Sequence, residues 1–304
     1  LGQLQKSGLD GIVTQALDDL PVLSCRYGTM LNESGGIIDD LIVFREDVEK
    51  WFLVVNGATT DKDVAHIQNH LTDDAVFKDL SSDLGKLDLQ GPLSREVLKK
   101  LAPGIERLNY YSFDYFELLG EKVLISRTGY TGELGYEIYF PWEETPELWN
   151  ALLQDDRVQP AGLGARDILR LEVGYSLYGH ELSEVINPIE GGLKKFINFD
   201  KNFIGKNALM QYLNDGIARK TVGILSQNRK SPRAGDKIYT PELEEIGEVT
   251  SGSFSPCLKK GIGLGLISKP EAQLNEPILI GNLESQFSAN IASKFFFKDG
   301  SLKS

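Results

Sequence analysis

The chain has 304 residues, of which 41% are hydrophobic and 25% charged, and its formal net charge is −12 at pH 7. This length and composition predict a globular protein of two or three domains, and the acidic balance argues against a general nucleic-acid binder. Two cysteines far apart in the sequence argue against a disulfide framework, and no apolar run approaches the roughly 20 residues of a membrane helix.

The first stretch predicts an antiparallel meander of three strands followed by a helix. Strands are expected at residues 24–31, 37–44 and 51–56, with turn-forming residues between them. The run Thr60-Asp61-Lys62-Asp63 predicts a capping box that opens a helix to about residue 71. A polar segment at 81–85 then predicts a domain boundary, so the first domain is expected to cover residues 1–84.

Two adjacent acids stand inside the second predicted strand, where residues 35–43 read GGIIDDLIV. Successive side chains of a strand point to opposite faces, so Asp39 and Asp40 are expected on different faces, each with apolar neighbours. A carboxylate in such surroundings loses hydration and needs a partner or a function. From the residues alone, either acid is a candidate catalytic or ligand-binding group, and the alternative is one exposed and one paired acid.

The rest of the chain divides into two further regions. Between 85 and 215, strands are expected at 86–90, 112–119, 122–127 and 135–140, and helices at 95–101, 145–153 and 165–174. Hairpins rather than βαβ repeats indicate the α+β class. Residues 216–304 contain short predicted strands and no convincing helix, ending with a strand at 287–297, which indicates a separate β-barrel or sandwich domain.

The segment RTGYTGELGYEIY, residues 127–139, joins two of these strands. Its glycines permit close approach of a ligand to the backbone. Tyr130 is able to stack on a flat ring, and Glu133 or Glu137 is able to accept hydrogen bonds from a guanidine-like edge. A tight hairpin explains the same residues equally well. The spacing required for dinucleotide binding is absent, so no such site is predicted.

Charged residues on two predicted helices offer further candidates. Arg166 and Arg170 lie one turn apart, and an arginine near a helix start is able to clamp a carboxylate or phosphate. An ordinary intrahelical pair between Asp167 and Arg170 is the favoured interpretation. His66 and His70 have metal-ligand spacing, but no suitable third ligand is evident, so no metal site is predicted.

Several long segments together resemble one family, the aminomethyltransferase or T-protein of the glycine cleavage system. They occur in the family's order over nearly the whole chain. The matching stretches are GGIIDDLIV (35–43), VVNGATTDKDV (54–64), LQGPLS (89–94), SRTGYTGELGYEIYFP (126–141), GLGARDILRLEVGYSLYGHEL (162–182), NPIEGGL (187–193), DKNFIGKNAL (200–209) and VTSGSFSPCLKKGIGLG (249–265).

The resemblance implies a three-domain, clover-like folate-binding fold with a C-terminal β-barrel, and tetrahydrofolate as co-substrate. The implied reaction moves a methylene carbon from the aminomethyl-lipoyl arm of H-protein to tetrahydrofolate and releases ammonia. Glycine decarboxylase and dihydrolipoyl dehydrogenase are the implied system partners, and neither nucleic acid nor membrane is expected. A related folate-dependent demethylase and a non-catalytic folate-binding module are the alternatives. The compartment is expected to be bacterial cytoplasm, or mitochondrial matrix in a eukaryote.

The resemblance also implies site residues. The second acid of the GGIIDD motif, Asp40, is the expected catalytic residue, and Asn56 stands where the family has a residue beside it. Tyr130 and Glu137 are the expected pterin contacts, and Arg166 is expected near the folate. Asp39 becomes a structural partner.

Two departures from the family pattern have consequences. The family's motifs begin well before the point where this chain starts, so part of the first domain is expected to be missing. Residues 280–286 read IGNLESQ and lack the arginine that often reaches the folate tail, which leaves Arg233 or the Lys259-Lys260 pair for that task. Because folate and many H-proteins are anionic, local basic groups are expected to attract them. The candidates are Lys194, Lys195, Lys201, Lys206, Lys259 and Lys260.

Overall fold

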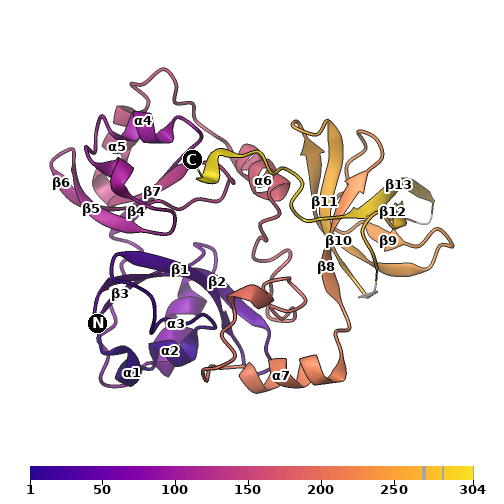
Figure 1. Ribbon diagram of the computed structural model, residues 1–304, viewed down its shortest axis with the longest axis horizontal. Coiled ribbons are helices and arrows are strands. Elements are labelled where there is room, and N and C mark those ends of the chain that lie inside the picture. Colours follow the sequence, from indigo (N-terminus) through magenta and orange to yellow (C-terminus); the bar gives the residue numbers. More distant parts are fainter. Residues whose placement is uncertain (269–271, 283, 304) are drawn as a thin grey trace.

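The computed structural model describes residues 1–268, 272–282 and 284–303, without the side chain of residue 303. Three lobes surround a common centre, and the last residues of the chain cross from the third lobe to the second (Figure 1). The α+β class and the C-terminal barrel predicted from the sequence are confirmed. Within the described residues, no helix has both the length and the apolar character needed to cross a membrane.

The first lobe is built on a three-stranded antiparallel sheet in the order β1-β2-β3. The predicted meander is therefore confirmed, and the helix after it begins at Thr60 as expected. The capping box is wrong, because the Thr60 hydroxyl donates back to the carbonyls of Asn56 and Gly57 and no side chain caps the helix. The elements are α1 (Leu4–Ser7), α2 (Leu9–Ile12), β1 (Ser24–Leu31), β2 (Ile37–Asp47), β3 (Lys50–Val54) and α3 (Thr60–His70).

The second lobe is a four-stranded antiparallel sheet in the order β4-β7-β6-β5. Its core gathers around Tyr136 and Ile138 of the central strand β7, both fully buried together with Leu98 and Leu148 of the covering helices. The elements are β4 (Leu84–Gln90), α4 (Ser94–Leu98), η1 (Ile105–Arg107), β5 (Phe113–Leu118), β6 (Glu121–Ser126), β7 (Gly135–Pro141), η2 (Trp142–Glu144) and α5 (Thr145–Leu152).

The chain then passes through α6 (Leu163–Glu172), η3 (Lys194–Phe196) and α7 (Lys206–Asp215). Leu182 and Leu209 pack against Leu31 and Ile37 of the first sheet, and the Ile37 N–H donates to the carbonyl of Ser183. Figure 1 shows α7 beneath the first lobe, far from the second. The sequence placed residues 85–215 in one domain. We propose instead that residues 177–215 belong with the first lobe, since their apolar side chains complete its core.

The third lobe is a closed six-stranded barrel in the order β10-β11-β8-β13-β12-β9. Its interior is filled by isoleucines such as Ile224, Ile238 and Ile280, none of which is exposed. The strands are β8 (Lys220–Ser226), β9 (Lys237–Tyr239), β10 (Glu245–Ser255), β11 (Lys260–Ile267), β12 (Pro277–Asn282) and β13 (Ser285–Ala292). Of the predicted domain 216–304, residues 269–271, 283 and 304 lie outside the described part of the chain.

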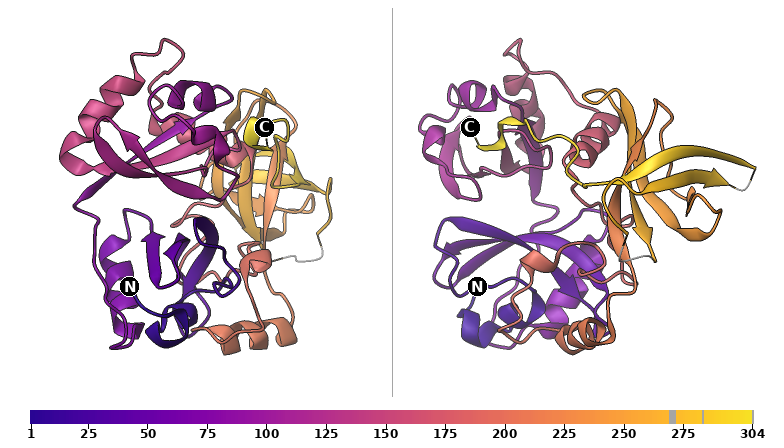
Figure 2. Two further views of the ribbon diagram at one scale, coloured as in Figure 1. Left: turned by 60° about the vertical axis from the view of Figure 1, so that its left-hand side comes forward. Right: turned by 45° about the vertical axis from the view of Figure 1, so that its right-hand side comes forward.

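The last predicted strand, at 287–297, is wrong in its second half. Strand β13 ends at Ala292, and the N–H groups of Phe296 and Phe297 donate to the carbonyl of Glu172 at the end of α6. The chain leaves the barrel here and reaches the second lobe, where it forms η4 (Ser301–Lys303) (Figure 2).

A buried arginine joins α6 to the barrel. Arg170 is 1% exposed, and its guanidinium donates to Glu181 at 3.1 Å and to the Ser251 hydroxyl of β10 at 2.8 Å. The predicted pair with Asp167 is confirmed at 2.7 Å. Because Glu181 is shielded from water, its charge depends on Arg170 for compensation.

Candidate active site

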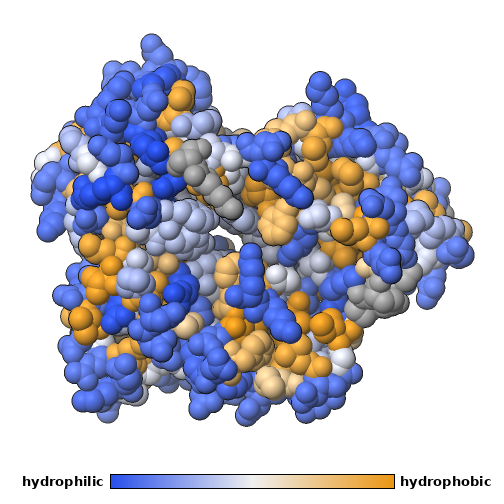
Figure 3. Space-filling model, viewed as in Figure 1, coloured by the Kyte–Doolittle hydropathy of each residue, from blue (hydrophilic) through white to orange (hydrophobic). Residues whose placement is uncertain are grey.

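A cavity of about 950 Å³ lies between the first and second lobes, with Lys294 and Phe295 beyond the barrel completing its wall, and the space-filling view shows the centre of the molecule hollowed (Figure 3). Strands of both sheets, the tyrosine-containing loop after β6, the start of α6 and the chain beyond the barrel all contribute to its wall. The lining includes Tyr27, Asp40, Ile42, Val54, Asn56, Lys86, Tyr110, Tyr111, Tyr130, Glu137, Arg166, Tyr175, Tyr178, Lys195, Phe196, Lys294 and Phe295. All five site residues predicted from the sequence are in this set.

Two hydrogen bonds hold the carboxylate of Asp40 at the cavity wall. The Tyr27 hydroxyl donates to Oδ2 at 2.9 Å, and the Asn56 side-chain amide donates to Oδ1 at 2.9 Å. Asp39 is fully buried on the opposite face of β2, where the Asn56 backbone N–H and side-chain amide donate to it at 2.9 and 2.8 Å. Strand alternation therefore separates the two acids as predicted, and one amide fixes both.

The environment of Asp40 changes its acidity. Burial, followed by the charge of the neighbouring Asp39, raises the pKa of Asp40 to about 6, against the opposing effect of the bonds from Tyr27 and Asn56. Burial, followed by the charge of Asp40, raises the pKa of Tyr27 well above its ordinary value. At neutral pH, Asp40 is thus an anion of unusually high basicity that a neutral phenol stabilises.

The structure distinguishes the two acids of the glycine-rich segment. Glu137 is buried at the cavity wall, where the Lys86 ammonium and the Thr128 hydroxyl donate to it. Glu133 instead accepts hydrogen bonds from Ser301 near the end of the chain. Of these two acids, only Glu137 is at the wall of this cavity.

Aromatic rings form another part of the wall. Tyr130 and Tyr175 stack with ring centroids 5.7 Å apart, and the Tyr130 hydroxyl donates to the carbonyl of Ser176. The Arg166 guanidinium lies 5.0 Å from the Tyr130 ring centroid and forms an ion pair with Asp88 at 2.7 Å. The predicted Arg166 cation is at the cavity, but an acid already compensates much of its charge.

Two lysines are further cations of the cavity wall. Lys195 and Lys294 both line it, and in the described part of the chain neither forms an ion pair with a carboxylate. The Lys294 ammonium donates to the Gly191 carbonyl at 3.2 Å, and burial together with Lys195 lowers its pKa. Arg233 and the Lys259-Lys260 pair, expected from the sequence to reach a folate tail, are not among the lining residues.

Sequence reasoning missed Tyr27, Lys86 and Tyr175. One signal was available for Tyr27, because β1 pairs with β2 and an aromatic residue near the Asp40 register position is able to reach it diagonally. Lys86 meets Glu137 across the β4–β7 pair, which required knowing that these strands are neighbours. Among the described residues, no group of three or more potential ligands is placed to hold a metal ion.

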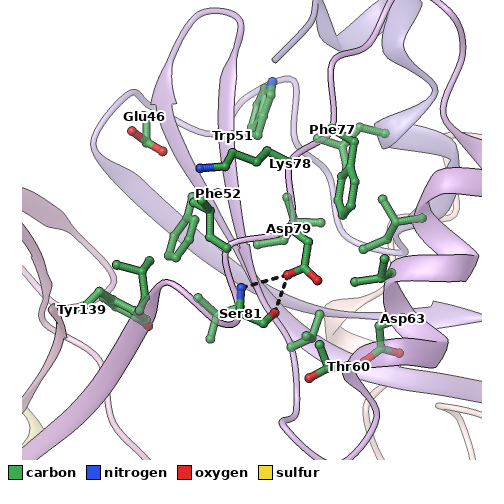
Figure 4. A pocket seen from close by; sticks show the side chains of 18 of the residues that line it. Glu46, Trp51, Phe52, Thr60, Asp63, Phe77, Lys78, Asp79, Ser81 and Tyr139 are labelled. Atoms are coloured by element: carbon green, nitrogen blue, oxygen red, sulfur yellow. Dashed lines mark hydrogen bonds between the residues drawn. The ribbon is translucent and has the colours of Figure 1, made fainter. Parts of the chain in front are cut away.

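A second cavity, of about 750 Å³, lies between β3, α3 and residues 75–81. Figure 4 shows the rings of Trp51, Phe52 and Phe77 around it, with Asp63 projecting from α3. Burial and the charge of the nearby Asp39 raise the pKa of Asp63 well above its ordinary value. Asn56 and Arg166 line both cavities, whereas Asp40, Tyr130 and Glu137 line only the larger one, so all five predicted site residues meet there alone.

Two family models match the chain, the GCVT N-terminal domain over residues 2–201 and the glycine cleavage T-protein C-terminal barrel domain over residues 219–298. The aminomethyltransferase of Pseudothermotoga lettingae is 39% identical over 300 residues, which cover 97% of this chain and 82% of that protein. That of Halothermothrix orenii is 42% identical over 277 residues, covering 90% and 77%. The crystal structure of glycine cleavage system aminomethyltransferase T from Bartonella henselae matches with a TM-score of 0.87 at 28% identity, covering 96% of this chain and 81% of that one.

Proposed function

The chain belongs to the glycine cleavage T-protein family, whose function is folate-dependent aminomethyl transfer, and we propose how its own residues perform that reaction. The substrate is the aminomethyl group on the lipoyl arm of H-protein, and the products are ammonia, methylenetetrahydrofolate and dihydrolipoyl H-protein. The observation that carries the proposal is the Asp40 carboxylate, held by Tyr27 and Asn56 at the wall of the central cavity.

The residues of the cavity fit tetrahydrofolate in size and chemistry. The cavity volume of about 950 Å³ is at the upper end of the range for ligand pockets, roughly 300–1,000 Å³. The Glu137 carboxylate is a buried acceptor suited to the amide-guanidine edge of a pterin. The aromatic rings of Tyr130 and Tyr175 at the cavity wall suit a planar ring system.

Bound tetrahydrofolate would supply the nitrogen nucleophiles that take the methylene carbon. We assign Asp40 the task of accepting a hydrogen bond from the attacking amine, which orients it, and of stabilising positive charge as ammonia departs. Tyr27 and Asn56 are the positioning residues, because each donates to a different carboxylate oxygen of Asp40. Their two bonds fix the carboxylate before substrate arrives, so little reorganisation is needed during the reaction.

The raised pKa of Asp40 predicts an acid limb in the pH profile. The carboxylate is the working form, so kcat/KM should be constant above about pH 7 and fall as pH drops through about 6. In the Tyr27→Phe variant a bond that favours the carboxylate is lost, and the limb should move to higher pH. Steady-state rates between pH 5 and 8.5, with circular dichroism as the control for folding, test this. A profile without a limb in that range, or an unmoved limb in Tyr27→Phe, contradicts the assignment.

The two unpaired lysines predict where the glutamyl tail binds. In Lys195→Gln/Lys294→Gln, KM for tetrahydrofolate should rise about tenfold, and more for polyglutamylated forms, because charge-assisted bonds to carboxylates are lost. Lys298→Gln is the matched control, since Lys298 is exposed and absent from the cavity wall. KM should be measured at low and high salt, because screening weakens the effect. An equal KM in the double variant and the control excludes this tail site.

Lipoylated H-protein is the partner that this reaction requires, with glycine decarboxylase and dihydrolipoyl dehydrogenase as further members of the system. The net charge of −12 gives no long-range attraction to an acidic partner, so local basic groups are needed at the contact. Among the predicted lysines, Lys201 already pairs with Asp10 at 2.8 Å. Lys194 and Lys195 are exposed and remain the better candidates.

Calorimetric titration with tetrahydrofolate tests the proposed ligand. One molecule is expected to bind per chain, and Glu137→Gln should weaken binding because an anionic acceptor becomes a neutral amide. Tyr115→Phe is a suitable control, since Tyr115 donates to Glu46 outside the cavity. Absence of binding to the folded native protein would overturn the proposal.

A further inference from the structure

The chain crosses from the barrel to the second lobe after β13, and Figures 1 and 2 show this crossing as the yellow segment that ends beside the second sheet. We call residues 293–303 the strap. Its first part forms cavity wall, through Lys294 and Phe295. The N–H groups of Phe296 and Phe297 then donate to the Glu172 carbonyl at 3.0 and 2.8 Å, which attaches the strap to α6.

The far end of the strap binds the loop after β6. The Ser301 N–H donates to Glu133 Oε2 at 2.8 Å, and the Ser301 hydroxyl donates to the same carboxylate. The Leu134 N–H donates to the Ser301 hydroxyl oxygen at 2.9 Å. Arg127 donates to the Leu302 carbonyl at 3.3 Å. Ser301 therefore donates through its backbone N–H and its hydroxyl to Glu133, and its hydroxyl also accepts a bond from Leu134.

The contact brings two backbones unusually close. Gly132 has a φ of +73°, a left-handed conformation that glycine adopts readily. A Cβ at Gly300 would stand 2.4 Å from the Gly132 carbonyl oxygen, so the strap approaches the loop at a point where a side chain is excluded. The fit is specific to this pairing of segments.

The loop so held, residues 127–134, carries groups at the cavity wall. Tyr130 lines the wall and stacks on Tyr175, and the Thr128 hydroxyl donates to Glu137. A loop fixed in this conformation before binding spares the ligand the entropic cost of ordering it. Glu133, which the sequence offered as a ligand acceptor, thus acts on the strap.

We propose that the strap positions the loop after β6, and with it Tyr130, for ligand binding, with Ser301 and Glu133 as the positioning residues. This inference rests on the proposed function, because the ligand whose affinity it controls is tetrahydrofolate. It adds a dependence of the central cavity on the last residues of the chain. The effect acts on binding and not on the chemical step, since neither residue lies at the wall beside Asp40.

The test compares Ser301→Ala with Ser301→Thr, which keeps the hydroxyl, and with Lys298→Ala, an exposed position of the same strap. In the unliganded protein, exchange of the Leu134 amide hydrogen should be at least about tenfold faster in Ser301→Ala, because its acceptor is lost. The dissociation constant of tetrahydrofolate should rise about three- to tenfold, with kcat nearly unchanged. Ser301→Thr should restore both quantities, and Lys298→Ala should alter neither.

Unchanged amide exchange in Ser301→Ala would show that the strap does not hold the loop. Faster exchange with an unchanged dissociation constant would overturn the positioning role and leave a purely structural contact. A fall in kcat with an unchanged dissociation constant of tetrahydrofolate would also overturn the positioning role. If the native protein bound no tetrahydrofolate, the proposed function would fail and the ligand role of the strap with it, whereas the exchange measurement would still report the contact separately.

Discussion

Replacing Asp40 by Asn is expected to lower kcat about 100-fold or more while tetrahydrofolate still binds. Asn keeps the size of the side chain and one oxygen, so it retains one of the two bonds from Tyr27 and Asn56, but it carries no charge. It therefore cannot stabilise the positive charge that develops as ammonia departs. Single-turnover rates and calorimetric affinity, measured on the same preparation, separate the chemical step from binding.

A stability measurement is the control for this variant. Burial raises the pKa of Asp40 from 3.8 to about 6, so the folded protein binds this proton more tightly than the unfolded chain does. The stabilisation from this proton is complete below pH 3.8 and is lost as pH rises through 6. At pH 7 the ionised Asp40 side chain therefore lowers the free energy of unfolding relative to a neutral one. Asp40→Asn should raise the unfolding free energy there by up to about 3 kcal/mol. Normal turnover in this more stable variant would remove Asp40 from the mechanism.

Replacing Arg170 by Met is expected to destabilise the protein by about 3–5 kcal/mol. Arg170 and Glu181 are each only 1% exposed, so removal of the Arg170 cation leaves the Glu181 carboxylate without an ion-pair partner and away from water. The loss also breaks the bond to Ser251 that attaches α6 to the barrel. Urea unfolding at pH 7 measures the effect, and separate unfolding of the barrel is a further expected sign.

Two variants check the physical reason. Arg170→Met/Glu181→Gln removes both charges and should recover part of the lost stability. Arg166 lies one turn away on the same helix, and its ion pair with Asp88 is partly exposed. The Arg166→Met variant should therefore lose no more than about 1 kcal/mol of unfolding free energy. Equal destabilisation by Arg166→Met and Arg170→Met would contradict the importance assigned to the buried pair.

Features set by local sequence were predictable. The meander, the α+β class and the placement of Asp39 and Asp40 on opposite faces follow from strand alternation and turn residues, and the structure has them. The choice of Asp40 over Asp39 came from the family resemblance, and the geometry agrees in that Asp40 lines the cavity. Composition favoured a barrel or a sandwich, and closure into a barrel depends on long-range strand pairing.

Contacts between distant segments were beyond sequence reasoning. Lys86 reaches Glu137 through a strand pair that no local signal specifies. The packing of α7 on the first lobe depends on apolar residues whose partners lie more than a hundred positions earlier. Phenylalanines at the start of the strap favour a strand up to residue 297, whereas the backbone N–H groups of Phe296 and Phe297 donate to α6.

Aminomethyl transfer itself is the most direct test of the central claim, that the cavity around Asp40 is the site of folate-dependent chemistry. The protein is mixed with aminomethyl-lipoyl H-protein and tetrahydrofolate, and ammonia and methylenetetrahydrofolate are measured together. We predict that the two products form in equal amounts, that both require tetrahydrofolate, and that Asp40→Asn reduces both in parallel. Ammonia release that is independent of tetrahydrofolate, or no release by a folded chain that binds it, would contradict the claim.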